Sequence, residues 1–257
     1  MVCIGEVLFD CIYDSEPIEG GGQIESYPGG APANVACALT KLGIYSRFLG
    51  SVGNDVEGLQ LLELLNKIGV NSQLCQILEA QNYPTRKVMV ARKVNGDRQF
   101  AGFWKNASTV SFADVYYSLP SQSWDQLNQL LKESVSAVVV GTLGLAHESP
   151  TKDFMGKLRG SLQSLPVESK PLFVVDINWR PVFWNVDNES EQQIARDRIR
   201  NFVSNCADIV KLTDDEAAWL LGNLGLDAET ALESPHKVYD LLKPRLVKIR
   251  NLLLFLR

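Results

Sequence analysis

The second half of the sequence alternates between short β-branched runs and longer segments with helical spacing, and this alternation constrains the fold more than any other feature. Strands are predicted at residues 137–140, 172–175 and 209–211, and helices at residues 192–204 and 214–221. Strands that alternate with helices form a mostly parallel sheet, which the helices cover on both faces. We therefore expect an α/β fold.

The first half adds elements of both kinds. Residues 2–9 and 45–52 are predicted as strands, and residues 33–42 and 56–68 as helices. A glycine follows each of these two helices, which is a common way for a helix to end. The apolar stripe of the second helix is expected at Leu59, Leu62, Leu65 and Ile68.

An Asn-Gly pair, Asn95 and Gly96, lies between two extended runs at residues 87–93 and 98–103. This arrangement predicts a β-hairpin. Both runs mix polar and apolar residues, so one face is expected to meet solvent or a ligand. Otherwise the hairpin would be an exposed sheet edge, which favours aggregation.

Charge and composition narrow the function classes. The 257 residues are 46% hydrophobic and 21% charged, with a net charge of -5, which is ordinary for a globular protein. An acidic chain without a basic cluster is a poor nucleic-acid binder, because neutralising phosphates needs a basic face. The N-terminus lacks a signal-peptide pattern and no apolar run is long enough to span a membrane. We expect a cytoplasmic protein without nucleic-acid or membrane partners.

The five cysteines are irregularly spaced, and no CxxC pair occurs. Free thiols in a reducing compartment are therefore expected, rather than disulfides or a zinc site. Cys3 and Cys37 lie in apolar runs and are expected to be small buried hydrophobic residues.

Residues 29–53 read GGAPANVACALTKLGIYSRFLGSVG. Gly29 and Gly30 lack a Cβ, so their backbone can approach a ligand closely. The helix that follows offers N–H groups to polar or anionic oxygens, and Asn34 adds a donor and acceptors in its first turn. A polyol needs such a mixture. The alternative is a loop-to-helix junction with Asn34 as a cap, and the residues alone favour it because Gly-rich turns are common.

The same segment resembles, over its whole length, the first signature of the ribokinase-like (PfkB) carbohydrate kinases. The matching positions are Gly29, Gly30, Asn34, Ala36, Gly43 and Gly53. Three further segments resemble the family: GEVLFD at 5–10 its first strand and sugar-contacting Asp, DINWRPVFW at 176–184 a fructokinase segment, and KLTDDEAAWLLG at 211–222 the region that organises magnesium and phosphate. Together they follow the family order and cover essentially the whole chain.

This resemblance implies a ribokinase-like three-layer α/β/α sandwich, with residues 1–257 as a single, incomplete domain. Residues of about 11–29 and 84–106 would form a small β-lid that covers the sugar and excludes water during phosphoryl transfer. The implied activity is that of a kinase that uses ATP and Mg²⁺ to phosphorylate a fructose-like sugar. A homodimer through the lid is the implied assembly.

The resemblance also implies roles for individual residues. The substrate contacts would be Asp10, Gly29, Gly30, Asn34, Lys105, Asn178 and Arg180, and the nucleotide and metal side would hold Lys211 and Glu216, with no direct metal ligand. Lys105 stands where relatives often carry Arg, so the charge is kept but the fork geometry is lost.

Three of these residues have alternative roles. Asp10 could be a strand-end cap, and Arg180, which could pair with phosphate oxygens, could instead form a surface ion pair. Glu216 could act through water on the metal or complete a capping box with Thr213, and both roles can coexist. Thr213 itself departs from the Asn often found at that position.

Phosphoryl transfer also needs a base and a site that stabilises charge. In this family both lie on a Gly-Ala-Gly-Asp segment near the C-terminus, whose glycines open a helix that forms an anion hole. No such segment follows Gly222, and no P-loop replaces it. We therefore expect the C-terminal part of the fold to be missing, no catalytic residue, and an inactive kinase. The alternatives are a non-catalytic sugar-binding remnant and a regulatory or oligomerisation module.

Overall fold

The computed structural model describes residues 1–14, 24–92, 98–104, 111–184, 186–222, 240, 246–249 and 252–255. The chain divides into two compact units. The N-terminal unit comprises residues 3–118 and 149–151, and the C-terminal unit comprises residues 1–2, 119–148 and 152–257.

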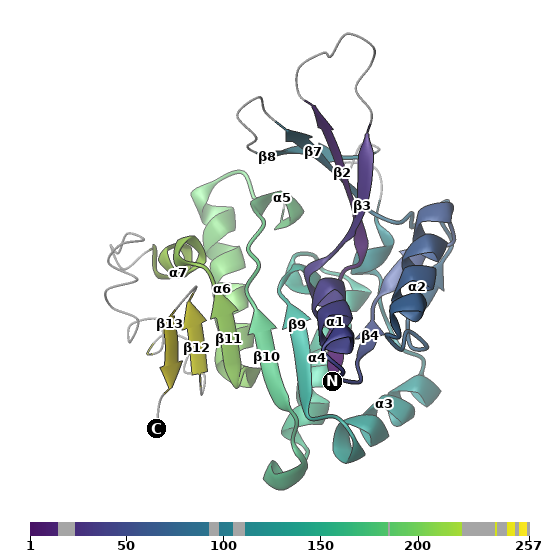
Figure 1. Cartoon of the computed structure of the whole chain (residues 1–257). Helices are drawn as coiled ribbons and strands as arrows, with labels where there is room; N and C mark the ends of the chain where they lie inside the picture. The colour runs from purple at the N-terminus through teal and green to yellow at the C-terminus, as the bar shows by residue number, and fades with distance from the viewer. Residues whose placement is uncertain are drawn as a thin grey trace. The chain divides into compact units, whose positions relative to one another are not determined.

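The C-terminal unit contains a mostly parallel sheet (Figure 1). Its strands, in spatial order, are β9 (Ala137–Gly141), β10 (Leu172–Asp176), β11 (Ile209–Leu212), β12 (Leu246–Ile249) and β13 (Leu252–Phe255). The first four strands pair in parallel, and β13 runs antiparallel to β12. The predicted α/β class is confirmed, and each predicted strand of this region forms within one or two residues of its expected bounds.

The β-branched runs form strands here because both of their faces are covered. Val138, Val140, Phe173 and Val175 are completely buried, as expected for strands of a parallel sheet whose two faces are both covered. The helices of this region are α3 (Ser121–Glu133), α4 (Pro150–Gln163), α5 (Pro181–Trp184), α6 (Glu189–Cys206) and α7 (Asp214–Leu221). Helix α6 covers β10: the Phe202 ring meets the Phe173 ring with centroids 6.0 Å apart.

The N-terminal unit contains a four-stranded sheet in the order β3-β2-β7-β8 (Figure 1). The strands are β2 (Leu8–Asp14), β3 (Glu25–Gly29), β7 (Lys87–Arg92) and β8 (Arg98–Phe103). β2 pairs antiparallel with β3 and parallel with β7, and β7 pairs antiparallel with β8. The two antiparallel arms predicted around the Asn-Gly pair are confirmed, while the turn itself lies outside the described residues.

The rest of this unit consists of two helices and shorter strands. They are β1 (Val2–Ile4), α1 (Ala31–Lys41), β4 (Arg47–Leu49), β5 (Ser51–Gly53), α2 (Val56–Ile68) and β6 (Gln76–Leu78). Short 3-10 helices lie at Ala113–Val115 here, and at Leu143–Leu145 and Val167–Ser169 in the C-terminal unit.

Two of the predicted strands are each divided into two by a glycine. The strand predicted at residues 2–9 stops at Ile4, and β2 begins at Leu8, because Gly5 takes a positive φ of 148°. The strand predicted at residues 45–52 breaks at Gly50, where an added Cβ would lie 2.4 Å from the Gly5 carbonyl oxygen. The close approach of these two backbones explains why neither run continues as a single strand.

Helix α2 forms at the predicted residues and ends at Gly69, which adopts the left-handed conformation. Its predicted apolar stripe is partly wrong. Leu65 is buried as predicted, but Leu61 is also buried and Leu59 is 48% exposed, so the buried face is centred on Gly58, Leu61 and Leu65. The Asp55 carboxylate caps the helix by accepting a hydrogen bond from the Gly58 N–H at 2.8 Å.

All five cysteines are free, as predicted. Cys3 is fully buried, but Cys37 is only partly buried, so the expectation for Cys37 is wrong. It lies on a flank of α1 and not on the buried face, which holds Pro32, Ala33 and Ala36.

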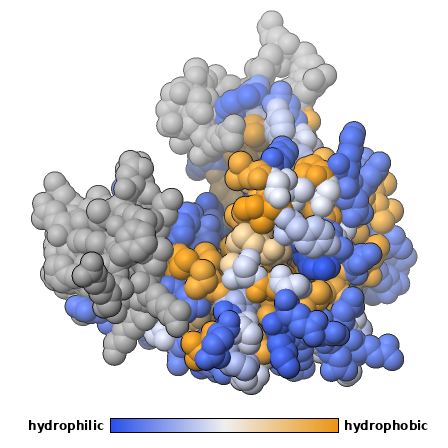
Figure 2. Space-filling model, turned by 60° about the horizontal axis from the view of Figure 1, so that its bottom comes forward, coloured by the Kyte–Doolittle hydropathy of each residue, from blue (hydrophilic) through white to orange (hydrophobic). Residues whose placement is uncertain are grey.

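The surface mixes apolar and charged side chains. Figure 2 shows hydrophobic patches interrupted by hydrophilic side chains on the face in view. Among the most exposed large apolar residues are Leu42, Val56 and Val167. Within the described part of the chain, no helix is both long and apolar enough to cross a membrane.

Candidate functional site

Asp10 lies in the interior of β2, beside the end of β3. The strand register pairs Asp10 with Tyr27 and pairs Leu8 with Gly29, so Asp10, Leu8 and Gly29 share one face of the sheet. A Cβ at Gly29 would lie 2.6 Å from Oδ2 of Asp10. Glycine at this position therefore leaves room for the carboxylate. Because Asp10 is followed by four more strand residues, it is not a strand-end cap.

Gly30 and Asn34 begin helix α1. Gly30 is the N-cap residue, with φ 103° and ψ 119°, and the Asn34 N–H donates to the Gly30 carbonyl oxygen at 2.9 Å. The Asn34 side chain is exposed and makes no capping hydrogen bond. The side-chain amide of Asn34 is thus exposed in the first turn of α1 and does not cap the helix. Lys105, the remaining predicted contact in this unit, lies outside the described residues.

Glu6 is a buried residue that the sequence analysis missed. Glu6 is only 4% exposed, and its Oε1 accepts a hydrogen bond from the Ala31 N–H at 3.1 Å. Burial raises the pKa of this carboxyl to about 7, against the lowering effect of the N–H groups of Glu6 and Ala31. A charged residue inside the otherwise apolar run of residues 2–9 was the signal that could have identified it.

A buried ion pair joins Arg86 and Asp114 in the same unit. The guanidinium donates from Nε at 2.7 Å and from Nη2 at 2.8 Å to the two carboxylate oxygens. Both side chains are about 5% exposed, and the Arg86 guanidinium lies over the rings of Phe103 and Phe112, at 4.9 and 4.4 Å from their centroids. This pair fixes the chain at the start of β7 to the segment near residue 112.

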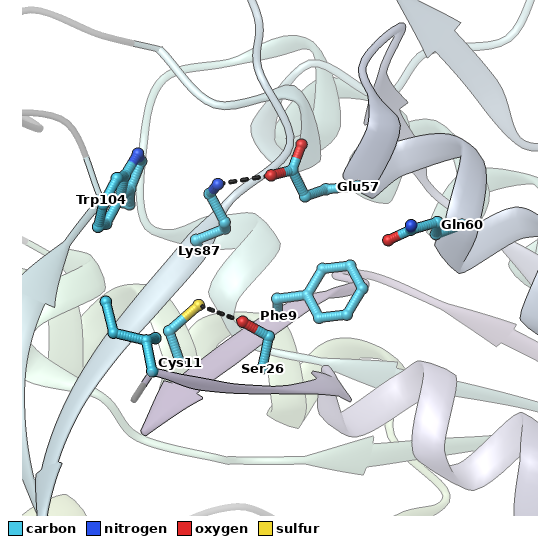
Figure 3. A pocket seen from close by; sticks show the side chains of 8 residues that line it. Phe9, Cys11, Ser26, Glu57, Gln60, Lys87 and Trp104 are labelled. Carbon is cyan, nitrogen blue, oxygen red and sulfur yellow. Dashed lines mark hydrogen bonds and ion pairs between the residues drawn. The ribbon is translucent and has the colours of Figure 1, made fainter. Parts of the chain in front are cut away.

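A pocket of about 260 Å³ opens on the other face of the four-stranded sheet (Figure 3). It is lined by Phe9, Cys11, Ile24, Ser26, Glu57, Gln60, Lys87 and Trp104. Lys87 points to Glu57 and forms an ion pair of 2.6 Å with it (Figure 3), and the hydrogen bond from Lys87 lowers the pKa of Glu57. Because Phe9 and Cys11 line the pocket and strand side chains alternate, Asp10 faces away from it.

In the C-terminal unit, three predicted residues follow or border β10. Asn178 has a φ of 42° and is the only non-glycine residue with positive φ in the described part of the chain; Asn tolerates this conformation better than most residues. Lys211 pairs with Asp176 across the parallel strands, with Nζ 2.9 and 3.1 Å from the two carboxylate oxygens. Arg180 is exposed and donates to the Trp179 carbonyl oxygen at 2.8 Å.

Glu216 joins the first turn of α7 to the segment after β10. Its Oε2 accepts from the Thr213 N–H at 2.7 Å and its Oε1 from the Trp179 N–H at 2.8 Å. The Thr213 hydroxyl accepts from the Glu216 N–H at 3.2 Å, which completes the predicted capping box. The Trp179 ring also stacks on Trp219, with centroids 3.7 Å apart. Each oxygen of the Glu216 carboxylate is therefore already engaged with a backbone N–H.

The described residues do not form a metal site made of protein ligands alone. Across the described ranges, no group of three or more His, Cys, Asp or Glu side chains could hold a metal ion. A Mg²⁺ ion that arrives with a nucleotide needs no such group, since it keeps several waters and binds through one or two carboxylates plus phosphate oxygens. Because each carboxylate oxygen of Glu216 already accepts a backbone hydrogen bond, contact between Glu216 and such an ion through a water molecule fits better than direct ligation.

The fold is of the α/β class, with a mostly parallel sheet. The pattern of the pfkB family carbohydrate kinases matches residues 1–155, which is more than half of the 257 residues. The chain therefore belongs to the pfkB family of carbohydrate kinases.

Individual relatives agree with this assignment. The probable fructokinase-5 of Arabidopsis thaliana is 33% identical over 223 residues, which cover 86% of this chain and 61% of that protein. This chain thus spans less than two thirds of the length of that relative. The crystal structure of fructokinase from Xylella fastidiosa superposes with a TM-score of 0.73 at 23% identity and covers 97% of this chain and 70% of that one. A structure of fructokinase from the same organism with bound ATP gives a TM-score of 0.71 at 22% identity, over 97% and 67% of the two chains.

Proposed function

We propose that this protein is a fructokinase-like member of its family, whose N-terminal unit binds a fructose-like sugar. The observation that carries the proposal is the arrangement of Asp10 against Gly29, with the Asn34 amide exposed in the first turn of the next helix. A carboxylate that accepts hydrogen bonds and an amide that both donates and accepts are the groups that vicinal hydroxyls require. The fructokinase names of the relatives support the choice of sugar.

The four-stranded sheet would act as the lid over this sugar. Its strands fall within the segments of about 11–29 and 84–106 that we assigned to a lid, apart from the start of β2. Closure of such a sheet would exclude water from the reacting hydroxyl. The same sheet would offer the surface for a homodimer, and Lys105 would contact the sugar from the segment after β8.

The C-terminal unit would face the phosphates. ATP supplies the phosphoryl group when bound, and Lys211, 47% exposed in its side chain, together with Arg180 would bind phosphate oxygens. Asn178 would contact the substrate. Glu216 would hold a Mg²⁺ ion through water, since its carboxylate oxygens already accept two backbone hydrogen bonds. The ATP-bound fructokinase of the same fold supports this use of ATP. The free cysteines support a reducing, cytoplasmic location.

A non-catalytic sugar-binding protein is the second candidate, and one sequence observation favours it for these 257 residues. They contain no Gly-Ala-Gly-Asp segment to supply the base and the anion hole. We therefore expect these residues on their own to bind the sugar without phosphorylating it.

A pair of measurements on the purified 257-residue chain separates the candidates. Fructose is titrated calorimetrically, and ADP release is followed in a coupled assay with fructose, ATP and Mg²⁺. Fructose binding without turnover is the expected result. Turnover of about 1 to 100 per second, normal for a kinase, would show that another residue acts as the base. No binding of fructose would refute the sugar site.

A further inference from the structure

The start of α1 lies directly on the chain between β1 and β2. A Cβ at Gly30 would lie 2.4 Å from the Glu6 carbonyl oxygen, and a Cβ at Gly5 would lie 2.6 Å from Cγ of Pro32. Two glycines with positive φ thus let these two backbone segments touch. The Gly29-Gly30 turn therefore packs directly against residues 5–7.

Helix α1 has Pro32 in its first turn, but it lacks two other usual devices for fixing that turn. It has no acidic residue in that turn, and its N-cap, Gly30, provides no side-chain hydrogen bond. Glu6 supplies both from 25 residues earlier in the chain: its carboxylate accepts from the Ala31 N–H at 3.1 Å. A carboxylate at this point satisfies an otherwise unpaired N–H and faces the positive end of the helix dipole.

We propose that Glu6 is a positioning residue for the sugar site, whose carboxylate holds Ala31 and thereby sets the Gly29-Gly30 turn and the direction of the Asn34 amide. This inference rests on the proposed sugar site but concerns a residue that does not touch the sugar. Glu6 is buried beneath the turn, whereas Asn34 is exposed.

The protonation of Glu6 gives the inference a measurable consequence. Its pKa is raised to about 7, chiefly by burial, and the charged side chains that act on it are Asp114, which raises the pKa, and Arg86, which lowers it. The ionised carboxylate accepts a hydrogen bond more strongly than the protonated one. The first turn of α1 is therefore held more firmly above pH 7 than below it.

The experiment combines a sugar titration with a direct observation of Ala31. Between pH 6 and pH 8, the Kd of the wild-type chain for fructose is expected to fall by roughly 3- to 10-fold. Over the same range the backbone amide signal of Ala31 in NMR is expected to shift with a midpoint near pH 7. Glu6→Gln keeps the shape of the side chain but cannot ionise, so both dependences should disappear.

Two control variants test the specificity of this result. Glu57→Gln removes a carboxylate that lies in the pocket on the other face of the sheet from Asp10, and His147→Gln replaces an exposed imidazole of the C-terminal unit. Both should keep the wild-type pH dependence.

An Ala31 amide signal that does not shift near pH 7 would overturn the inference. So would a Glu6→Gln variant whose Kd for fructose depends on pH as that of the wild type does. If the wild-type chain binds no fructose at any pH, the proposed function fails, and the Ala31 titration in wild type and Glu6→Gln alone decides whether Glu6 holds the turn.

Discussion

The Glu216 carboxylate accepts a hydrogen bond from the Trp179 N–H at 2.8 Å and so ties helix α7 to the segment that follows β10. The two residues are 37 positions apart in the chain. This segment holds Asn178 and Arg180, two of the predicted contacts, so their placement depends on a residue that we first assigned to the metal side.

Replacing Glu216 with Ala is expected to lower the free energy of unfolding by about 2–3 kcal/mol, because it removes half of a capping box and leaves two backbone N–H groups without their acceptor. The fluorescence of the stacked Trp179 and Trp219 should change as well. Asp215→Ala, at an exposed position in the same helix turn, should change neither property by much. A Glu216→Ala chain as stable as Asp215→Ala would show that the tie is unimportant.

The Arg86–Asp114 pair predicts strongly coupled mutations. Each of Arg86→Met and Asp114→Leu leaves a buried charge unpaired and is expected to cost about 3–5 kcal/mol of the free energy of unfolding. The double variant removes both charges and should cost far less than the sum of the two. Urea unfolding of the four chains measures this coupling, and additive losses would contradict a direct buried pair.

Gly30 and Gly43 make a matched pair, because both have positive φ but only Gly30 is crowded. A Cβ at Gly43 would meet nothing within 4 Å, whereas one at Gly30 would meet the Glu6 carbonyl oxygen. Gly43→Ala should therefore cost only about 1–2 kcal/mol for the unfavourable backbone conformation, and Gly30→Ala clearly more. Thermal unfolding compares them, and equal losses would mean that the contact between Gly30 and residue 6 is loose.

The buried Glu6 predicts a stability that depends on pH. Its pKa is about 7 in the folded chain, against the ordinary value of 4.5 for a glutamate, so the folded state holds the proton more tightly. Ionisation strengthens the hydrogen bond to Ala31, but burying the charge costs more than this bond contributes. The stabilisation by the bound proton is therefore fully present below about pH 4.5 and is lost as the pH rises through about 7, with a total on the order of 3 kcal/mol. The free energy of unfolding of wild type minus that of Glu6→Gln should fall across this window. A flat difference would mean that Glu6 is not buried as described.

Asp10 predicts a loss of sugar binding. Asp10→Asn removes a charged acceptor from the proposed site and should weaken fructose binding by about 10- to 100-fold. Asp14→Asn changes the same residue type in the same strand, where the carboxylate pairs with Arg92 at 2.8 Å, and should leave the affinity within about twofold, since a partly exposed ion pair contributes little. Equal affinities of the two variants would place the sugar elsewhere.

The sequence alone determined the local elements and the family. The β-branched runs at residues 137–140 and 172–175 predicted strands correctly, because burial on both faces leaves a continuous apolar signature. The capping box of Thr213 and Glu216 and the helix stop at Gly69 were also predicted, since both depend on residues a few positions apart. The signature at residues 29–53 indicated the family because each of its glycines and its Asn stands at a fixed spacing.

Only the tertiary structure decided which distant residues meet. The division of residues 2–9 into two strands, the hydrogen bond of Glu6 to Ala31 and the second partner of Glu216 all depend on contacts between segments far apart in the chain. Periodicity describes how neighbouring side chains alternate, but it carries no information on which backbone passes close enough to require a glycine or to accept a hydrogen bond. The residues proposed to contact the sugar could thus be named from the sequence, while the hydrogen bond that joins the buried Glu6 carboxylate to Ala31 could be found only in the fold.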